Sequence, residues 1–174
     1  MNIFALDTNP ITAGKMHCDK HVPKMIVESL QMLGCAVIRH GATPDQMPLT
    51  QKGTPLKGGY HYHPCSIWAG DTRSNFIWLC HLAGSLVEEF EHRFGKEHFS
   101  ADGIEHLYTM AHMIPDGDLT PLALAMPDEY KIGFNLKHAV LESAIEFYRY
   151  YYHSKSFASW DKGRPAPDWW EGAF

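Results

Sequence analysis

The sequence predicts a compact, single-domain, all-α fold with long loops. Apolar residues recur at helical spacing over several long segments, whereas alternation typical of strands is rare. The chain has 174 residues, of which 45% are hydrophobic, enough to bury one apolar core. No internal repeat divides it. We therefore expect one domain over residues 1–174, with an aromatic C-terminal tail, residues 154–174, that docks on the body.

The first long helix is expected to run from about Asp19 to Arg39. Asp is a favoured N-cap, and Pro23 is tolerated only near the first turn of a helix. The apolar stripe of this helix is Val22, Ile26, Leu30, Leu33 and Val37, and a polar stripe on another side is His21, Lys24, Glu28, Gln31 and Cys35. Ahead of it, a short apolar stretch over residues 2–7 ends in a turn signal at Asn9-Pro10.

The rest of the chain alternates between helices and irregular segments. Residues 40–64, rich in Gly and Pro, predict a long loop, which in a compact domain is either functional or disordered. Further helices are expected over residues 66–94, 102–113 and about 134–153, with an irregular stretch over residues 115–131 between the last two.

The charge balance restricts how this chain could bind nucleic acid. The formal net charge is −5, which opposes broad electrostatic adhesion, so a DNA-binding protein of this composition must gather its basic groups on one face. Basic residues interleaved with aromatic ones suit contacts with phosphates and bases, although an ordinary surface loop is an equal alternative. The candidate DNA-binding residues are Lys24, Lys52, Lys57, Tyr60, His61, His63 and Arg73.

Several classes of protein are disfavoured. No apolar run is long enough for a membrane span, and the N-terminus does not resemble a signal peptide, so we expect a cytoplasmic protein without a membrane partner. The four cysteines form no C-x-x-C pair and are expected to be free thiols. P-loop, dinucleotide-binding and serine-hydrolase motifs are absent.

Histidine is abundant, with 12 residues, and metal ligation is the first chemistry to consider. His17 and His21 are four residues apart, His61 and His63 flank Tyr62, and Asp7 or Asp19 could complete a set. The sequence nevertheless lacks H-E-x-x-H, zinc-finger spacing and the zinc-deaminase signature. We therefore expect neither a metal nor another cofactor.

Three blocks of sequence together resemble the phage pyrimidine-dimer DNA glycosylases of the endonuclease V type. Asp19-Lys20-His21, followed by Glu28 seven residues after the histidine, is similar to that family's first-helix motif. His63-Pro64, Trp68 and the later Arg93-Phe94-Gly95 resemble its second-helix block, and the aromatic residues 150–152 and 169–170 resemble its tail. The likeness covers about half of the chain loosely. The N-terminal block M-N-I-F-x-L-D also resembles that of many bacteriophage proteins.

The resemblance implies a compact helical enzyme that binds duplex DNA and takes a nucleotide out of the base stack. In that family the nucleophile is the α-amine exposed by removal of the initiator Met, assisted by a glutamate whose place Glu28 takes here, with His21 in the place of the accompanying histidine. Position 2 is Asn, which is too large for efficient Met removal, and Val27 and Gln31 stand where the family has basic residues.

Three hypotheses follow from these departures. The first is a transferase of the phage DNA-hypermodification type, which joins the amine of a free amino acid to an activated 5-substituent of an extrahelical thymine-like base in double-stranded DNA. Glu28 is then the general base, and His21, His17 and Asp7 line the pocket. The second is a pyrimidine-dimer N-glycosylase and AP lyase that uses the amine of residue 1 or of Lys24. The third is a non-enzymatic phage module that binds DNA or protein.

Overall fold

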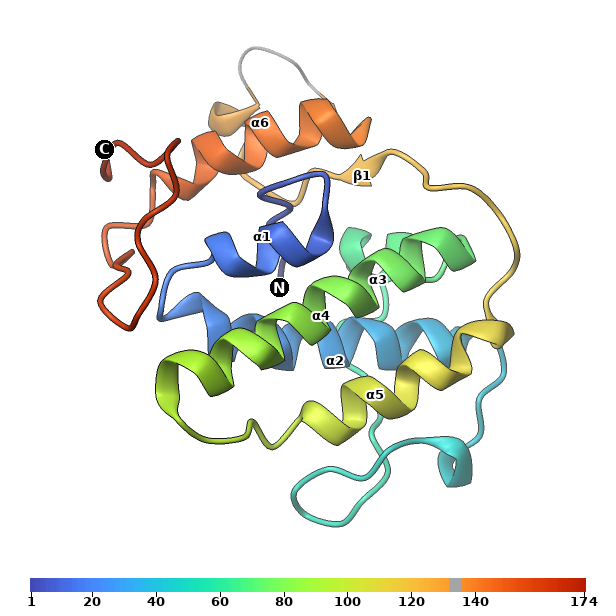
Figure 1. Ribbon diagram of the computed structural model, residues 1–174. Coiled ribbons are helices and arrows are strands. Elements are labelled where there is room, and N and C mark those ends of the chain that lie inside the picture. Colours follow the sequence, from blue (N-terminus) through green and yellow to red (C-terminus); the bar gives the residue numbers. More distant parts are fainter. Residues whose placement is uncertain (132–135) are drawn as a thin grey trace.

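The computed structural model describes residues 1–131 and 136–174, and it confirms a mostly α-helical fold. Six α-helices lie in this described part (Figure 1): α1 (Pro10–Met16), α2 (His21–Arg39), α3 (Pro64–Ala69), α4 (Arg73–Phe94), α5 (Ala101–Thr109) and α6 (Leu141–Tyr152). Two short strands, β1 (Leu122–Ala123) and β2 (His138–Ala139), pair antiparallel, with Leu122 opposite Ala139. Short 3-10 helices cover Pro44–Gln46, Met110–Met113 and Asp128–Tyr130.

The core lies where α4 packs against α1 and α2. Helix α5 packs against both α4 and α2 (Figure 1). The predicted apolar stripe of α2 supplies part of it, because Val22, Ile26, Leu33 and Val37 are buried. The N-terminal residues Ile3 to Leu6 are also buried, so the short apolar stretch that opens the sequence runs through the interior. Burying these side chains removes apolar surface from water, the main driving force for this packing.

The helix boundaries differ from the predicted ones in three places. The helix expected over residues 66–94 is two helices, α3 and α4, separated at Gly70–Thr72, where the Thr72 side chain accepts from the Asn75 backbone N–H and caps α4. The helix expected over residues 102–113 ends its α-helical part at Thr109 and continues as a 3-10 turn. The last helix begins at Leu141, later than predicted; residues 134 and 135 of the predicted range lie outside the described residues.

Helix α1 is absent from the sequence prediction, which placed a turn at Asn9-Pro10. The Asn9 side chain accepts hydrogen bonds from the N–H groups of Ile11 and Thr12, and Pro10 occupies the first helical position. Both are favourable at a helix start, where backbone N–H groups lack helical partners. The same two residues that signal a turn therefore begin a helix here.

A buried ionic network joins α4 to the loop before α2 and to the C-terminal tail. The Arg93 guanidinium pairs with Glu89 at 3.0 Å and with Asp19 at 3.1 Å, and it donates to the carbonyls of His17 and Lys15. Arg164 from the tail binds the other side of Glu89, at 2.6 Å. The Trp160 indole N–H also donates to the Met16 carbonyl at 3.1 Å, so the tail packs on the body of the fold.

Candidate functional site around Glu28

The carboxylate of Glu28 lies beside the amino terminus of the chain. Its Oε2 accepts a hydrogen bond from the Asn2 backbone N–H at 2.8 Å and is 3.8 Å from the Met1 amino nitrogen. Lys24, one turn earlier on α2, lies 3.7 Å from Oε1. The Glu28 side chain is 13% exposed and lines a cavity of about 400 Å³. The other lining residues are Met1, Lys24, Val27, Gln31 and Tyr60.

Asn2 holds this end of the chain in place. Its side-chain amide donates to the Ala125 carbonyl at 2.7 Å, and its Oδ1 accepts from the N–H groups of Ile3 and Phe4. The Met1 side chain, 1% exposed, is covered as well, and the Ser66 hydroxyl donates to its sulfur at 3.4 Å. The amine is therefore fixed against Glu28 by contacts on both sides of it.

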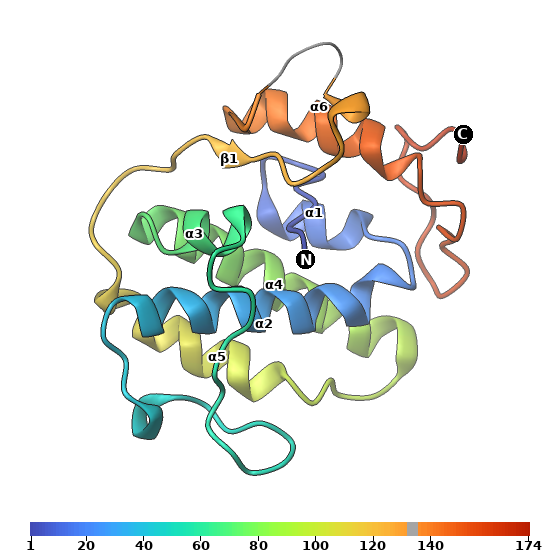
Figure 2. The same ribbon diagram turned by 180° about the vertical axis from the view of Figure 1, so that it is seen from behind.

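The loop before α3 crosses the outer face of α2 and closes one side of the cavity (Figure 2). Cys35 anchors it, because its thiol donates to the Gly59 carbonyl and its sulfur accepts the Gly59 N–H, both at 3.1 Å. Gly58 lies so close that an added Cβ would be 2.6 Å from the Cys35 sulfur. The next residue of the cavity wall, Tyr60, is 70% exposed.

One of two strained backbone positions in the described part of the chain lies in the wall of this cavity. Among the described residues, the non-glycine positions with positive φ are Phe4 (50°) and Tyr60 (59°). A bulky residue in the left-handed region costs free energy and persists only where surrounding contacts hold it, which happens most often at functional sites. Tyr60 lines the Glu28 cavity, and Phe4 follows Asn2 by two residues.

His63 is fixed in one tautomer at the same site. Its Nδ1 accepts the Cys65 backbone N–H at 3.2 Å as the N-cap of α3, so a neutral ring carries its proton on Nε2. Burial lowers the pKa of His63, and the positive charge of the amino terminus lowers it further, against an opposing effect of Glu28. The histidine is thus a neutral hydrogen-bond donor close to both charged groups.

His21 and His17 are buried in the core rather than in the cavity wall. The His21 ring stacks on Phe4 with centroids 4.8 Å apart, and its Nδ1 is 2.8 Å from the Tyr152 hydroxyl. The same hydroxyl accepts the Cys18 backbone N–H at 2.9 Å, so Tyr152 joins His21 to the residue before Asp19. Burial, the largest cause in each case, lowers the pKa of His17 to about 4 and that of His21 to about 2, so both rings are neutral near pH 7.

Three lysines surround the end of α2 that carries His21. Besides burial and His17, the charges of Lys24, Lys155 and Lys20 lower the pKa of His21, which requires all three to lie near it. Lys20 lies 4.5 Å from the Phe157 ring centroid and Lys155 lies 3.5 Å from that of Tyr151. This grouping of cations with aromatic rings is a local basic surface on a chain of net charge −5. The sequence interpretation included Lys24 but missed Lys20 and Lys155.

The remaining sequence-predicted residues occupy several places. Lys57 and His61 are exposed on the crossing loop, where His61 Nε2 donates to the Lys57 carbonyl at 3.0 Å. Asp7 lies 3.6 Å from Arg149 of α6 and accepts the Asn9 N–H. Arg73, at the start of α4, pairs with Asp116 and donates to the carbonyls of Ala111 and Ile114. The contacts of Asp7 and Arg73 are structural, and neither residue lines the Glu28 cavity.

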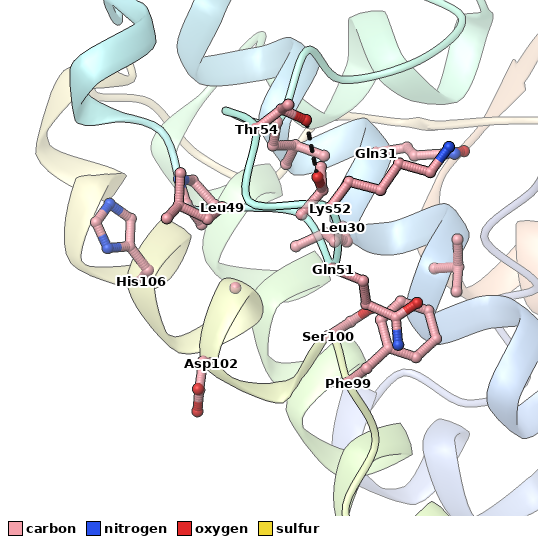
Figure 3. Close-up of a pocket in the computed structure, with 15 residues that line it drawn as sticks. Leu30, Gln31, Leu49, Gln51, Lys52, Thr54, Phe99, Ser100, Asp102 and His106 are labelled. Carbon is pink, nitrogen blue, oxygen red and sulfur yellow. Dashed lines mark hydrogen bonds between the residues drawn. The ribbon is translucent and has the colours of Figure 1, made fainter.

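Lys52 lines a different and larger cavity, of about 640 Å³, between α2, the loop over residues 48–56 and α5 (Figure 3). Leu30 and Gln31 of α2 belong to its lining, as do Asp102 and His106 of α5. Val27 and Gln31 line both this cavity and the smaller one at Glu28, so the two are neighbours separated by these side chains. Its walls are mainly apolar, with polar groups at the edges.

Met1 and Asn2 lie at the candidate site, although the sequence analysis gave them less weight than the other residues there. Their contribution depends on a contact 26 residues away in sequence, between Asn2 and Glu28, for which the local pattern gives no signal. Within residues 1–131 and 136–174, no cluster of three or more potential ligands is arranged to hold a metal. None of the helices in that part is long and apolar enough to cross a membrane.

Comparisons with protein-family profiles, with curated proteins and with solved structures found no match to this chain.

Proposed function

We propose that this protein is a DNA-processing enzyme of the glycosylase and AP-lyase type, in which the Met1 α-amine is the nucleophile and Glu28 its proton acceptor. The observation that carries the proposal is the 3.8 Å separation between the Met1 nitrogen and Glu28 Oε2 at the edge of a cavity of about 400 Å³. A nucleophile within reach of a base that other contacts hold in place is the arrangement that covalent catalysis needs.

The reaction at an abasic site shows what each group does. Glu28 takes a proton from the ammonium group, and the free amine adds to the C1′ aldehyde of the ring-opened sugar. Glu28 returns this proton to the carbinolamine hydroxyl, whose loss as water gives an iminium ion. Glu28 then accepts a C2′ proton as the 3′-phosphate leaves, and hydrolysis of the imine restores the amine. Glu28 is 2.8 Å from the Asn2 N–H, which keeps its carboxylate aimed at the amine between these steps. The Nε2–H of His63 is suited to donate a hydrogen bond to a sugar or phosphate oxygen.

The surroundings of the cavity suit DNA as the substrate. Lys24 lines the cavity, and Lys20 and Lys155 lie near His21 at the beginning of the same helix, so positive charge for phosphate contacts is available on this side of a chain of net charge −5. Lys24 is 59% exposed, so it can contact a phosphate while it lies near Glu28. Tyr60, exposed at the rim, offers a ring on which an unstacked base can pack.

The test is reductive trapping on abasic duplex DNA with borohydride. We expect a covalent protein–DNA adduct that maps to the N-terminal peptide, with intact-protein mass spectrometry showing an unblocked chain that begins at Met1. Glu28→Gln should reduce trapping about 100-fold, in the range of general acid–base effects, while leaving DNA affinity nearly unchanged. The matched control is Glu146→Gln, which changes an exposed glutamate on α6. An adduct that maps to a lysine, or unchanged trapping by Glu28→Gln, would refute the assignment.

One observation favours a second candidate, the transfer of an amino acid amine to an activated 5-substituted pyrimidine in DNA. The cavity of about 640 Å³ next to the Glu28 site has room for a second substrate. In that reaction Glu28 deprotonates the incoming amine. The Met1 amine already occupies the position beside Glu28, so the geometry favours the lyase reaction. Mass spectrometry of nucleosides from DNA incubated with the protein, amino acids and phosphorylated hydroxymethyluracil sites would detect the transfer product.

A non-enzymatic module that binds DNA or protein is the remaining hypothesis, and its DNA-binding form can be tested in the same assays. It predicts affinity for duplex DNA with neither a trapped adduct nor a modified nucleoside, under conditions where the chain is folded.

A further inference from the structure

A third cavity, of about 500 Å³, lies where the C-terminal end of α1, helix α6 and the tail meet (Figure 1). Three cationic side chains line it, Lys15, Arg149 and Arg164, and Asp168 is the one carboxylate in its lining. Glu89 and Asp7 pair with Arg164 and Arg149 from outside this lining, so the cavity offers cationic N–H donors without a net excess of positive charge. Neither Glu28 nor Met1 lines it, so it is distinct from the candidate active site.

Each of the two arginines uses part of its donor set within the protein, and Arg149 Nη2 also lies 3.6 Å from Asp7. Arg149 Nε donates to the Leu6 carbonyl at 2.9 Å, and Arg164 binds Glu89 through Nε and Nη2. Within the part of the chain that the structure describes, Nη1 of each arginine and Nζ of Lys15 make no hydrogen bond. A guanidinium that is already oriented loses less entropy when it binds an anion, and its fork of N–H groups matches the oxygens of a phosphate.

The rest of the lining is suited to a flat apolar group. Trp169 lies in the wall with the Arg149 guanidinium 5.5 Å from its ring centroid, and Pro165 and Pro167 flank it. Aromatic and proline surfaces pack against planar rings, and the volume is within the range of small-molecule sites. A phosphate with an attached heterocycle would use both halves of the cavity.

We propose that this cavity binds a nucleoside monophosphate, with the phosphate on Lys15, Arg149 and Arg164 and the base against Trp169. The proposal does not depend on the reaction proposed for Glu28.

The test measures binding of thymidine monophosphate, thymidine and inorganic phosphate to the full chain by isothermal titration calorimetry. We expect the nucleotide to bind more tightly than either fragment, since only it engages both the cations and the wall. Equal affinity for inorganic phosphate would overturn the part assigned to Trp169. The whole proposal would be overturned if the nucleotide did not bind at about 10 mM, a concentration above the dissociation constants of even weak, millimolar ligands.

Two exposed positions allow the charge of the cavity to be changed without removing a structural contact. Asp168→Asn removes the opposing carboxylate and should tighten nucleotide binding about 3-fold, whereas Ala166→Glu should weaken it about 5-fold, as expected for one charge near the surface. Lys52→Gln, at the other cavity, is the matched control and should change nothing. A gain of affinity in Asp168→Asn cannot arise from misfolding. If both variants match the control, the nucleotide does not bind here.

Discussion

Arg93 is the residue whose removal should destabilise the fold most clearly. Its side chain is fully buried and makes two ion pairs, with Asp19 and Glu89, and two hydrogen bonds to the carbonyls of His17 and Lys15. Arg93→Met keeps much of the apolar stem but leaves two buried carboxylates without this partner. Such a change leaves uncompensated charge in the interior, which is far more costly than the net contribution of the pair itself.

The expected loss of unfolding free energy depends on the partners that Glu89 and Asp19 keep. Breaking a buried ion pair costs about 3–5 kcal/mol. Glu89 keeps Arg164, and Asp19 keeps the Asp161 backbone N–H at 2.7 Å, so we expect the lower end, about 3 kcal/mol. For a chain of this length, that loss corresponds to a fall in Tm of about 6–12 °C. The assay is urea unfolding followed by circular dichroism at pH 7.

Arg39→Met is the matched control, because Arg39 pairs with Asp71 at 2.9 Å on the surface and its loss should cost at most about 1 kcal/mol. Acid provides a second check. Although burial raises the pKa of Glu89, hydrogen bonds from Arg164 and Arg93 lower it below its usual value. The stabilisation that this shift provides is present above the pKa of Glu89 in the unfolded chain. It is lost as the pH falls through the pKa of Glu89 in the folded protein. The difference between wild type and Arg93→Met should therefore narrow below about pH 4. Equal losses in the two variants at pH 7 would refute the reasoning.

Two further predictions concern the core histidines and the crossing loop. Because burial lowers the pKa of His17 to about 4 and that of His21 to about 2, the unfolded chain binds more protons than the folded one below pH 6.5. The free energy of unfolding should thus fall by about 2 kcal/mol per histidine between pH 6.5 and pH 5. His21→Phe should remove about half of this fall. The prediction is contradicted if urea titrations give the variant the same dependence of unfolding free energy on pH as the wild type. Gly58→Ala places a Cβ 2.6 Å from the Cys35 sulfur at φ +68° and should lower the free energy of unfolding by about 1–3 kcal/mol. The control is Gly53→Ala, at φ +71° with nothing within 4 Å of the new Cβ, which should lower it by about 1–2 kcal/mol. Equal losses of unfolding free energy in the two glycine variants would show that the loop can move away from Cys35 without loss of stability.

Helical periodicity was sufficient to predict α2 and its two faces. Val22, Ile26, Leu33 and Val37 are buried, and Lys24, Glu28 and Gln31 line one cavity, as the 3.6-residue period requires. His21 belongs to the same predicted polar stripe, yet it is buried. Its burial is caused by Phe4 and Tyr152, which reach it from the two ends of the chain, and a local pattern carries no information about such contacts.

Two local signals were misinterpreted because each supports more than one structure. Asn9-Pro10 is common in turns and equally suited to the N-cap and first position of a helix, and only the following turn of α1, packed on α4, distinguishes the two. Likewise, the apolar stripe from Trp68 to Phe94 continues across Gly70–Thr72, although the helix does not. Thr72 accepts the Asn75 N–H and starts α4 in a new direction, a cap that periodicity alone does not reveal.

The Glu28 site exists only because three segments far apart in the sequence meet there. Glu28 itself comes from α2, the amine and Asn2 come from the N-terminus, and Tyr60 and His63 come from the loop that Cys35 holds. Asn2 in turn depends on the Ala125 carbonyl, in the segment after β1. A solvated polar face of α2 would need none of these contacts, nor the positive φ of Phe4 and Tyr60. The left-handed backbone of Tyr60 persists only because surrounding contacts hold it, so the wall of the Glu28 cavity has a free-energy cost that a solvated helix face would not require.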